Sequence, residues 1–319
     1  MKFRQLGRTG LRVSEIGFGC WAIGGSGYGV TDDRESLDAL EAAWEHGVNF
    51  FDTADTYGHG HSEELLAGFL KERSRDQYVV ASKCGWDFYD KAGSRKNFEP
   101  EYIRFACEQS LKRLGFEAID VYQLHNPSLE LIERGEAIGE LAKLKTQGLI
   151  RFAGVSVHTE AEALRVIADG RVDTLQLVFN MLDQRMAARV LGEAESKNIG
   201  IIVREPLACG ILSGKYDAEH EFAKEDHRRR WTREKRELDL KKLERLKPIL
   251  STARLSLVRA ALEYVLEYTP VSTVIPGAKK RPQVLENLLA TEDPRLRIQE
   301  AAQLRDIFRK EPLFQQGLR

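Results

Sequence analysis

Val48-Asn49-Phe50-Phe51-Asp52-Thr53-Ala54-Asp55-Thr56-Tyr57 is the stretch around which the rest of the chain can be organised. Its apolar first half predicts the end of a short buried strand, and the glycines at positions 58 and 60 predict a turn directly after it. Asp52 and Tyr57 would therefore leave one strand end together. An acid and a phenol placed in this way are candidate catalytic groups that need partners from other strand ends.

Helical patterns and short apolar runs alternate along most of the chain. We expect helices at about 32–46, 61–72, 99–114, 129–147, 159–168, 184–197, 254–268 and 281–290, and strands near residues 16, 48, 78, 119, 151, 174, 200 and 272. Eight strand–helix units with short connections favour an α/β fold closed into a (β/α)8 TIM barrel. The short runs on either side of Gly7-Arg8-Thr9-Gly10 predict an N-terminal β-hairpin that caps the closed end of the barrel, and extra helices are expected at the C-terminus. No repeat or linker divides residues 1–319, so we expect a single barrel domain.

Two further strand ends carry side chains that would complete a site with Asp52 and Tyr57. Lys83 closes the apolar run at 78–82, and His125 closes the run at 119–124. Because the loops after the strands of a parallel barrel gather on one face, these four side chains should meet there. Each residue alone also has an ordinary structural interpretation, such as a turn cap for Asp52 or a core histidine for His125. The four together favour catalysis.

Composition limits the classes of function. The chain has 319 residues with 42% apolar composition, which is enough for a large core, and a net charge of −1, which gives no reason to expect nucleic acid or an anionic membrane as a partner. No apolar run approaches the roughly 18 residues of a membrane span, and the first residues do not resemble a signal peptide, so we expect a cytoplasmic protein. The four cysteines lack metal-ligand spacing, so no metal site is expected. The oligomeric state is left open.

Two loops and one charged segment would shape the mouth of the barrel. The loop at 21–30 has Gly-x-Gly spacings, but the next helix starts too far away for a dinucleotide fingerprint. Trp21 in that loop and Trp86 in the loop at 86–97 are candidate substrate walls, with packing on the barrel as the alternative. In residues 217–248 the leucine spacing predicts an exposed helix laid over a loop. A mobile cover is the alternative there, and the near balance of charges disfavours a nucleic-acid patch.

Several motifs, taken in order, resemble the aldo-keto reductase superfamily. They are Leu6-Gly7-Arg8-Thr9-Gly10-Leu11, Asp52 to Gly58, Ser82-Lys83, Gln123-Leu124-His125, Pro206-Leu207 to Lys215-Tyr216, and Ile275-Pro276-Gly277. Each motif is weak alone, but their order and spacing extend over almost the whole chain. The resemblance implies a (β/α)8 barrel that reduces a small-molecule carbonyl, an aldehyde or ketone, with NADPH.

The four candidate residues suit this reaction on physical grounds. Hydride transfer to a carbonyl builds negative charge on the oxygen, which must be protonated or stabilised as it forms. Tyrosine, with a usual pKa of about 10, is a reluctant acid, so Lys83 would bias Tyr57 toward phenolate. Asp52 would hold Lys83 charged, and His125 would hydrogen-bond the carbonyl oxygen.

The resemblance also implies cofactor contacts on several loops. The basic start of the last predicted helix would receive the 2′-phosphate, which favours NADPH over NADH, although a charged helix start is the alternative. The residues implied for this loop are Gly277, Lys279, Lys280, Arg281 and Gln283. Those implied elsewhere are Glu286 and Asn287 at the adenine, Ser156, Gln176 and Asn180 around the nicotinamide, and Pro206, Leu207, Gly210 and Leu212 along the pyrophosphate.

Two positions depart from the family pattern. Val157 follows Ser156 where members often carry asparagine, so one amide contact is missing or comes from Gln176. Arg204 stands where many members place an aromatic ring against the nicotinamide. A guanidinium can stack on a flat ring or pair with Glu205, and both alternatives remain open.

Two other classes of function remain as alternatives. The first is a redox-sensing regulatory subunit on the same barrel, which would retain the cofactor tightly and turn over at a negligible rate. The second is a lyase that uses Lys83 to form a Schiff base, which borohydride would trap.

Overall fold

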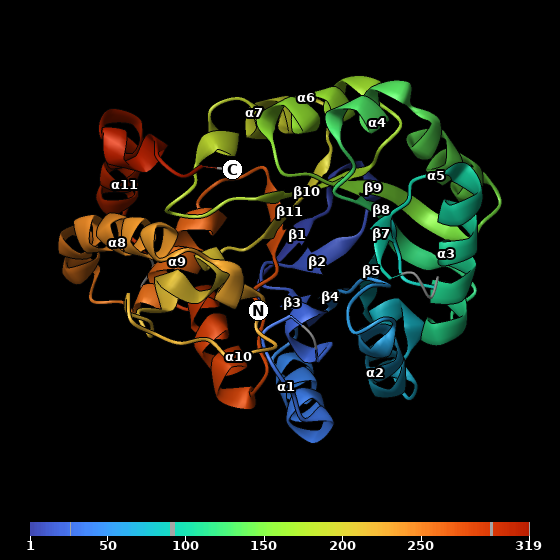
Figure 1. The fold of residues 1–319 in the computed structure, drawn as a ribbon, viewed down its shortest axis with the longest axis horizontal. Helices are drawn as coiled ribbons and strands as arrows, with labels where there is room; N and C mark the ends of the chain where they lie inside the picture. The colour runs from blue at the N-terminus through green and yellow to red at the C-terminus, as the bar shows by residue number, and fades with distance from the viewer. Residues whose placement is uncertain (26, 90–92, 294–295, 319) are drawn as a thin grey trace.

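The structure is a computed structural model that describes residues 1–25, 27–89, 93–293 and 296–318. Eight parallel strands lie side by side, surrounded by helices (Figure 1). In sheet order they are β3 (Phe18–Gly19), β4 (Phe50–Asp52), β5 (Val79–Cys84), β8 (Ile119–His125), β9 (Ile150–Ser156), β10 (Thr174–Val178), β11 (Gly200–Arg204) and β12 (Val271–Val274). Parallel bridges from Ile16 to Val274 and from Gly19 to Gly277 join the first strand to the last. The predicted (β/α)8 barrel is therefore confirmed.

The helices form the outer layer of the barrel. They are α1 (Asp33–Glu45), α2 (His61–Leu70), α3 (Pro100–Leu114), α4 (Leu129–Arg134), α5 (Glu136–Thr146), α6 (Glu160–Asp169), α7 (Val190–Ser196), α8 (Arg233–Ala253), α9 (Leu257–Leu266), α10 (Arg281–Leu288) and α11 (Ile298–Lys310). Capping side chains mark several starts, such as Asp32, which accepts hydrogen bonds from the first amides of α1. Among the described residues, no helix is both long and apolar enough to cross a membrane.

One predicted helix, at 129–147, is two helices in the structure. The chain turns at Gly135, which has a φ of 74° and serves both as the C-cap of α4 and as the N-cap of α5. Only glycine adopts this left-handed conformation at little cost, so the break is built into the sequence at that position. The predicted helix at 184–197 is likewise reduced to α7 after a short 3-10 turn at Arg185–Ala187.

The N-terminal hairpin caps the barrel as predicted. Strands β1 (Phe3–Gln5) and β2 (Arg12–Ser14) pair antiparallel, and the Leu6 and Val13 side chains between them are fully buried. These two side chains belong to a cluster with Phe50, Val121 and Ile202 that is separate from the core beneath the helices. The hairpin thus closes the end of the barrel at which the strands begin.

The charged segment differs from its prediction. Its second half is α8, which packs against α9 and α11 and buries Leu243, Leu246 and Leu250. It is therefore an amphipathic part of the helical layer and not an exposed helix laid over a loop. Leucine spacing indicated the helix correctly, but it could not indicate that α11, more than fifty residues later, covers the apolar face.

Candidate active site

Lys83 is the centre of a buried polar cluster at the carboxyl ends of the strands. Its Nζ donates hydrogen bonds to Asp52 Oδ1 at 2.6 Å, to the Thr53 carbonyl oxygen at 2.8 Å and to Tyr57 Oη at 3.1 Å. Asp52 ends β4 and Lys83 lies near the end of β5, so the barrel brings them together as the sequence predicted. The His125 ring, at the end of β8, lies edge-on to Tyr57 with 5.8 Å between ring centres.

The charge of Lys83 is fixed by these contacts. Burial alone would lower the pKa of Lys83, but the charges and hydrogen bonds of Asp52 and Tyr57 outweigh it and raise the pKa above its usual value. The three ammonium hydrogens meet three acceptors, so no lone pair is free to attack a carbonyl. This arrangement opposes the Schiff-base alternative.

The pKa values of Tyr57 and His125 are shifted in opposite directions, and burial is the main cause of both shifts. Burial raises the pKa of Tyr57, although the Lys83 charge opposes this, so the phenol keeps its proton at neutral pH. Burial, reinforced by the Lys83 and Arg204 charges, lowers the pKa of His125 well below its usual range. A neutral imidazole offers one N–H donor and one acceptor, and its Nδ1 is buried with no partner among the described residues.

Two glutamines hold the second carboxylate oxygen of Asp52. Gln176 Nε2 donates to Asp52 Oδ2 at 2.7 Å, and Gln123 Nε2 donates at 3.3 Å. Both oxygens of the buried carboxylate are therefore satisfied, and its orientation toward Lys83 is fixed. Gln123 belongs to the Gln123-Leu124-His125 motif, but its position in that motif gave no sign that it would hold Asp52.

A cavity of about 1150 Å³ opens above this cluster. Its walls come from the strand ends, the loop around Trp21, residues 224–230, and some of the residues within the segments 205–216 and 275–287. The predicted site residues that line it are Trp21, Asp52, Tyr57, Trp86, His125, Gln176, Arg204, Pro206, Leu207, Gly210, Gly277, Lys279, Gln283, Glu286 and Asn287. Ser26 and residues 90–92, which belong to the two predicted wall loops, lie outside the described residues.

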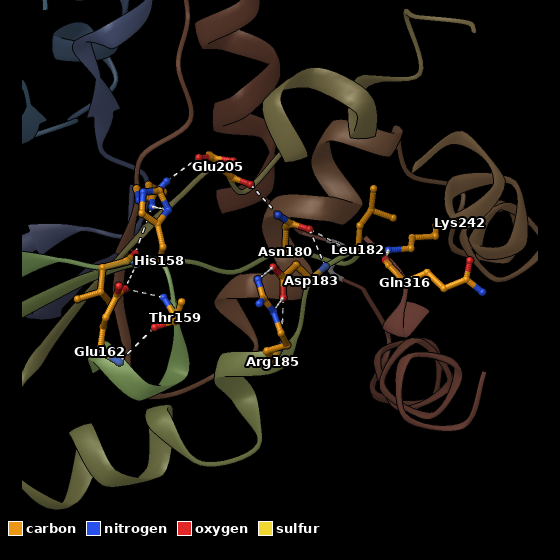
Figure 2. A network of polar contacts seen from close by, with 12 residues as sticks. His158, Thr159, Glu162, Asn180, Leu182, Asp183, Arg185, Glu205, Lys242 and Gln316 are labelled. Atoms are coloured by element: carbon orange, nitrogen blue, oxygen red, sulfur yellow. Dashed lines mark hydrogen bonds and ion pairs between the residues drawn. The ribbon is translucent and has the colours of Figure 1, made fainter. Parts of the chain in front are cut away.

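Other predicted residues lie behind the wall. Ser156 Oγ donates to Asn126 Oδ1 at 3.0 Å, and it is Asn126 that lines the cavity. Asn180 Nδ2 donates to the Glu205 carbonyl oxygen at 3.0 Å, while its Oδ1 accepts from the amides of Leu182 and Asp183 (Figure 2). Leu212 is fully buried in the core. These side chains position the wall, and the cavity itself is lined by their neighbours.

The guanidinium of Arg204 makes an ion pair and hydrogen bonds through its two terminal nitrogens. Its Nη1 lies 2.5 Å from Glu205 Oε1, and its Nη2 bonds to His158 Nδ1 at 2.9 Å and to the Val157 carbonyl oxygen at 3.1 Å. Figure 2 shows the neighbouring contacts, in which Glu162 accepts from the amides of His158 and Thr159. Arg204 thus pairs with Glu205, one of the two alternatives open from the sequence, and it also lines the cavity.

The basic residues at the start of α10 do not all face the cavity. Lys279 lines it and donates to the Tyr28 carbonyl oxygen. Lys280 and Arg281 form ion pairs with acidic residues of α1 instead. The three cations expected to form one cluster for a 2′-phosphate are therefore separated: Lys279 faces the cavity, and Lys280 and Arg281 face α1.

Sequence reasoning missed the contact between the loop at 21–30 and the segment at 226–231. Tyr28 and Asp226 form an antiparallel bridge, and the His227 ring lies 4.5 Å from that of Trp21. The buried Arg228 pairs with Asp226 at 2.7 Å. No sequence signal indicated these partners, because a backbone bridge and a ring contact between segments about 200 residues apart have no spacing rule.

The residues present suit a nicotinamide cofactor. Polar side chains at the strand ends, including Gln176, Asn126 and His125, line the cavity and can meet a carboxamide. The loop after β11 also lines the cavity; Ala208, Cys209 and Gly210 in it have φ values of 47°, 51° and 98°, and the amides of Ala208 and Gly210 donate to the carbonyl oxygens of Glu205 and Leu207. The barrel and its site are those expected of a nicotinamide-dependent oxidoreductase without a Rossmann fold.

Comparison with known proteins gives the family. The model of the Aldo/keto reductase family matches residues 15–309. An NADH-specific methylglyoxal reductase of Escherichia coli is 31% identical over 91% of this chain and 93% of its own, and a probable voltage-gated potassium channel subunit beta of Arabidopsis thaliana is 31% identical over 92% of each. The holo form of an aldo-keto reductase from Bacillus halodurans superposes with a TM-score of 0.81 at 30% identity over 96% of each chain. The chain belongs to the aldo/keto reductase family.

Proposed function

We propose that the protein reduces aldehydes or ketones to alcohols with NADPH, and that Tyr57 is the general acid. The observation that carries this proposal is the buried Lys83 ammonium, which lies 2.6 Å from Asp52 and 3.1 Å from Tyr57 Oη, two residues that line the cavity. A phenol that keeps its proton next to a fixed cation is suited to protonate an oxygen that gains negative charge.

Each residue has a distinct part in the proposed reaction. Bound NADPH supplies the hydride. Tyr57 donates its proton to the carbonyl oxygen, and Lys83 stabilises the phenolate that remains. Asp52, held by Gln176, keeps Lys83 in place, and the neutral His125 orients the carbonyl oxygen with a hydrogen bond, because its lowered pKa leaves it uncharged.

The cofactor would lie along the remaining walls. Asn126 and Gln176 would hold the carboxamide, Pro206, Leu207 and Gly210 the pyrophosphate, and Glu286 and Asn287 the adenine. Lys279 supports the choice of NADPH, since it is a cation in the cavity wall near these residues. A family relative is named as NADH-specific, so the preference is decided by measuring kcat/KM with both cofactors.

The test of the proposed acid is the substitution Tyr57→Phe. We expect it to lower kcat for an aromatic aldehyde by roughly 10²–10⁴-fold, the usual contribution of a positioned acid, with an unchanged Kd for NADPH. Consumption of NADPH at 340 nm with the wild type in parallel gives the rate, and protein fluorescence gives the Kd. A variant as active as the wild type would contradict the role of Tyr57.

A second function is favoured by the Arabidopsis relative, which is described as a probable potassium channel β subunit. A regulatory subunit would bind NADPH in the same cavity but turn over negligibly with every carbonyl tried. Retention of the cofactor through gel filtration, together with the absence of turnover in the wild type, would favour this alternative over the reductase.

A further inference from the structure

Three acidic side chains of α1 face the start of α10. Glu35 Oε1 lies 2.9 Å from Lys280 Nζ, and Asp38 Oδ1 lies 2.9 Å from Arg281 Nη1. Glu45 pairs with the other terminal nitrogen of Arg281. The two helices lie side by side on the outside of the barrel (Figure 1). Two basic residues next to the proposed cofactor site are thus held by a neighbouring helix.

The start of α10 is held in this arrangement by its own backbone contacts. Gln283 Oε1 accepts hydrogen bonds from the amides of Lys279 at 2.8 Å and of Lys280 at 3.2 Å. Lys279 and Gln283 line the cavity, whereas Lys280 and Arg281 are not among its lining residues. With the backbone fixed, Lys280 and Arg281 can approach the cavity only by leaving their partners on α1.

We propose that Glu35, Asp38 and Glu45 are cofactor-specificity residues, which hold Lys280 and Arg281 away from the 2′-phosphate of NADPH and so reduce the preference of the site for NADPH over NADH. This inference rests on the proposed function for its effect on catalysis. The inference itself is tested by measuring cofactor binding at equilibrium. The two cofactors differ only at the 2′ position. A phosphate there gains much from a nearby guanidinium, and a hydroxyl gains little.

The exposure of these ion pairs sets how strongly the acidic residues can affect the choice of cofactor. The side chains of Lys280 and Glu35 are 58% and 49% exposed. Exposed ion pairs are weak and are screened by salt, so a dianionic phosphate can compete with them. The acidic residues of α1 should therefore weaken the preference for NADPH without abolishing it.

The test removes the acids and keeps the basic residues. We expect the triple variant Glu35→Gln, Asp38→Asn, Glu45→Gln to bind NADP⁺ about three- to tenfold more tightly, which is the range that weak exposed pairs can control, with the Kd for NAD⁺ unchanged. Quenching of tryptophan fluorescence gives both constants. Glu41→Gln is the matched control, because Glu41 is also on α1 but pairs with Arg73 at 2.6 Å. It should leave the ratio of the two Kd values at the wild-type level.

Two further measurements identify the cation. Addition of Arg281→Gln to the triple variant should remove most of the gain in NADP⁺ affinity, and high salt should narrow the difference between the triple variant and the wild type. An unchanged ratio in the triple variant, or equal changes for both cofactors, would overturn the inference. Absence of turnover with either cofactor would count against the proposed reductase, while the binding ratios would still decide this inference.

Discussion

At the scale of single residues, the site depends on one charge that burial would otherwise remove. The Lys83 side chain has no exposed surface, and Asp52 is its only carboxylate partner in the described part of the chain. Taking an ammonium out of water costs several kcal/mol unless an opposite charge and good hydrogen bonds offset the loss. The proposed catalysis and the stability of the fold thus depend on the same pair, Asp52 and Lys83.

The substitution Asp52→Ala tests this dependence. We expect it to lower the free energy of unfolding by about 3–5 kcal/mol, because it leaves a buried cation without its partner. Urea denaturation measures the change. The control Glu41→Ala breaks a more exposed pair with Arg73 and should cost no more than about 1 kcal/mol. Equal losses in the two variants would contradict the special position of the Lys83 pair.

His158 gives the molecule a predictable response to acid. Burial, followed by the charge of Arg204, lowers the pKa of His158 to about 4. The unfolded histidine has a pKa of about 6.5, so between pH 6.5 and 4 the unfolded chain binds a proton that the folded chain does not. Stability should therefore be complete above pH 6.5 and fall as the pH drops toward 4.

The variant His158→Gln isolates this contribution. Its urea midpoint should fall less between pH 7 and pH 4.5 than that of the wild type, because the glutamine takes up no proton. His125 also has a lowered pKa, so the variant should keep part of the acid sensitivity. A difference between the two proteins that is constant with pH would show that His158 does not titrate in this window.

At the scale of elements, the hairpin and the site occupy opposite ends of the barrel. The end at which parallel strands begin contributes to stability, and the end at which they finish carries the chemistry. The substitution Leu6→Ala should therefore lower the free energy of unfolding by about 2–5 kcal/mol, as expected for a fully buried leucine, and leave kcat for the aldehyde unchanged.

The control for this prediction is Phe3→Ala, at a position on β1 that is 39% exposed. Its effect on stability should be smaller than that of Leu6→Ala. A fall in kcat for a folded Leu6→Ala protein, measured below its unfolding temperature, would instead indicate that the hairpin transmits strain to the strand ends.

Elements were predictable where a local rule decided them. The strands are apolar runs next to turn residues, and α1 (Asp33–Glu45) lies within one residue of the predicted helix at 32–46. The break between α4 and α5 required attention to Gly135, because the helical period continues on both sides of it. The burial of α8 depended on α11, and no local pattern of residues 217–248 contains that information.

At the scale of the whole molecule, the cavity is assembled from segments that are far apart in the chain. Arg228 pairs with Asp226 and donates to the Cys209 carbonyl oxygen at 3.1 Å, which joins the segment at 226–231 to the loop after β11. Ring contacts between His227 and Trp21 join the same segment to the loop after β3. The cavity therefore includes a wall that lies outside the strand ends.

This wall predicts protection from trypsin by the cofactor. Arg229 and Arg230 are exposed and line the cavity, so bound NADP⁺ should slow cleavage after them, by up to about 100-fold at 100 times its Kd if cleavage requires the empty site. Mass spectrometry of timed digests gives the rate at each bond. Cleavage after the exposed Lys310 in α11 is the internal control and should not change, whereas equal rates at Arg229 with and without NADP⁺ would refute the prediction.

The sequence by itself determined the barrel and the four candidate catalytic residues. Strand–helix alternation repeats a local pattern eight times, and eight units with short connections favour closure into a barrel. Asp52, Tyr57, Lys83 and His125 were accessible for the same reason, since each lies at or just beyond the end of a predicted strand and parallel strands end on one face.

Only the tertiary structure decided which neighbours each side chain meets. It turned Lys280 and Arg281 toward α1, placed Ser156 and Asn180 behind the wall, and brought His227 against Trp21. Such contacts join side chains that are up to some 240 residues apart, and their partners are selected by packing and charge after the barrel has formed. Local periodicity carries no information on that choice, so the contacts on which the proposed cofactor preference depends are decided by packing and not by the sequence pattern.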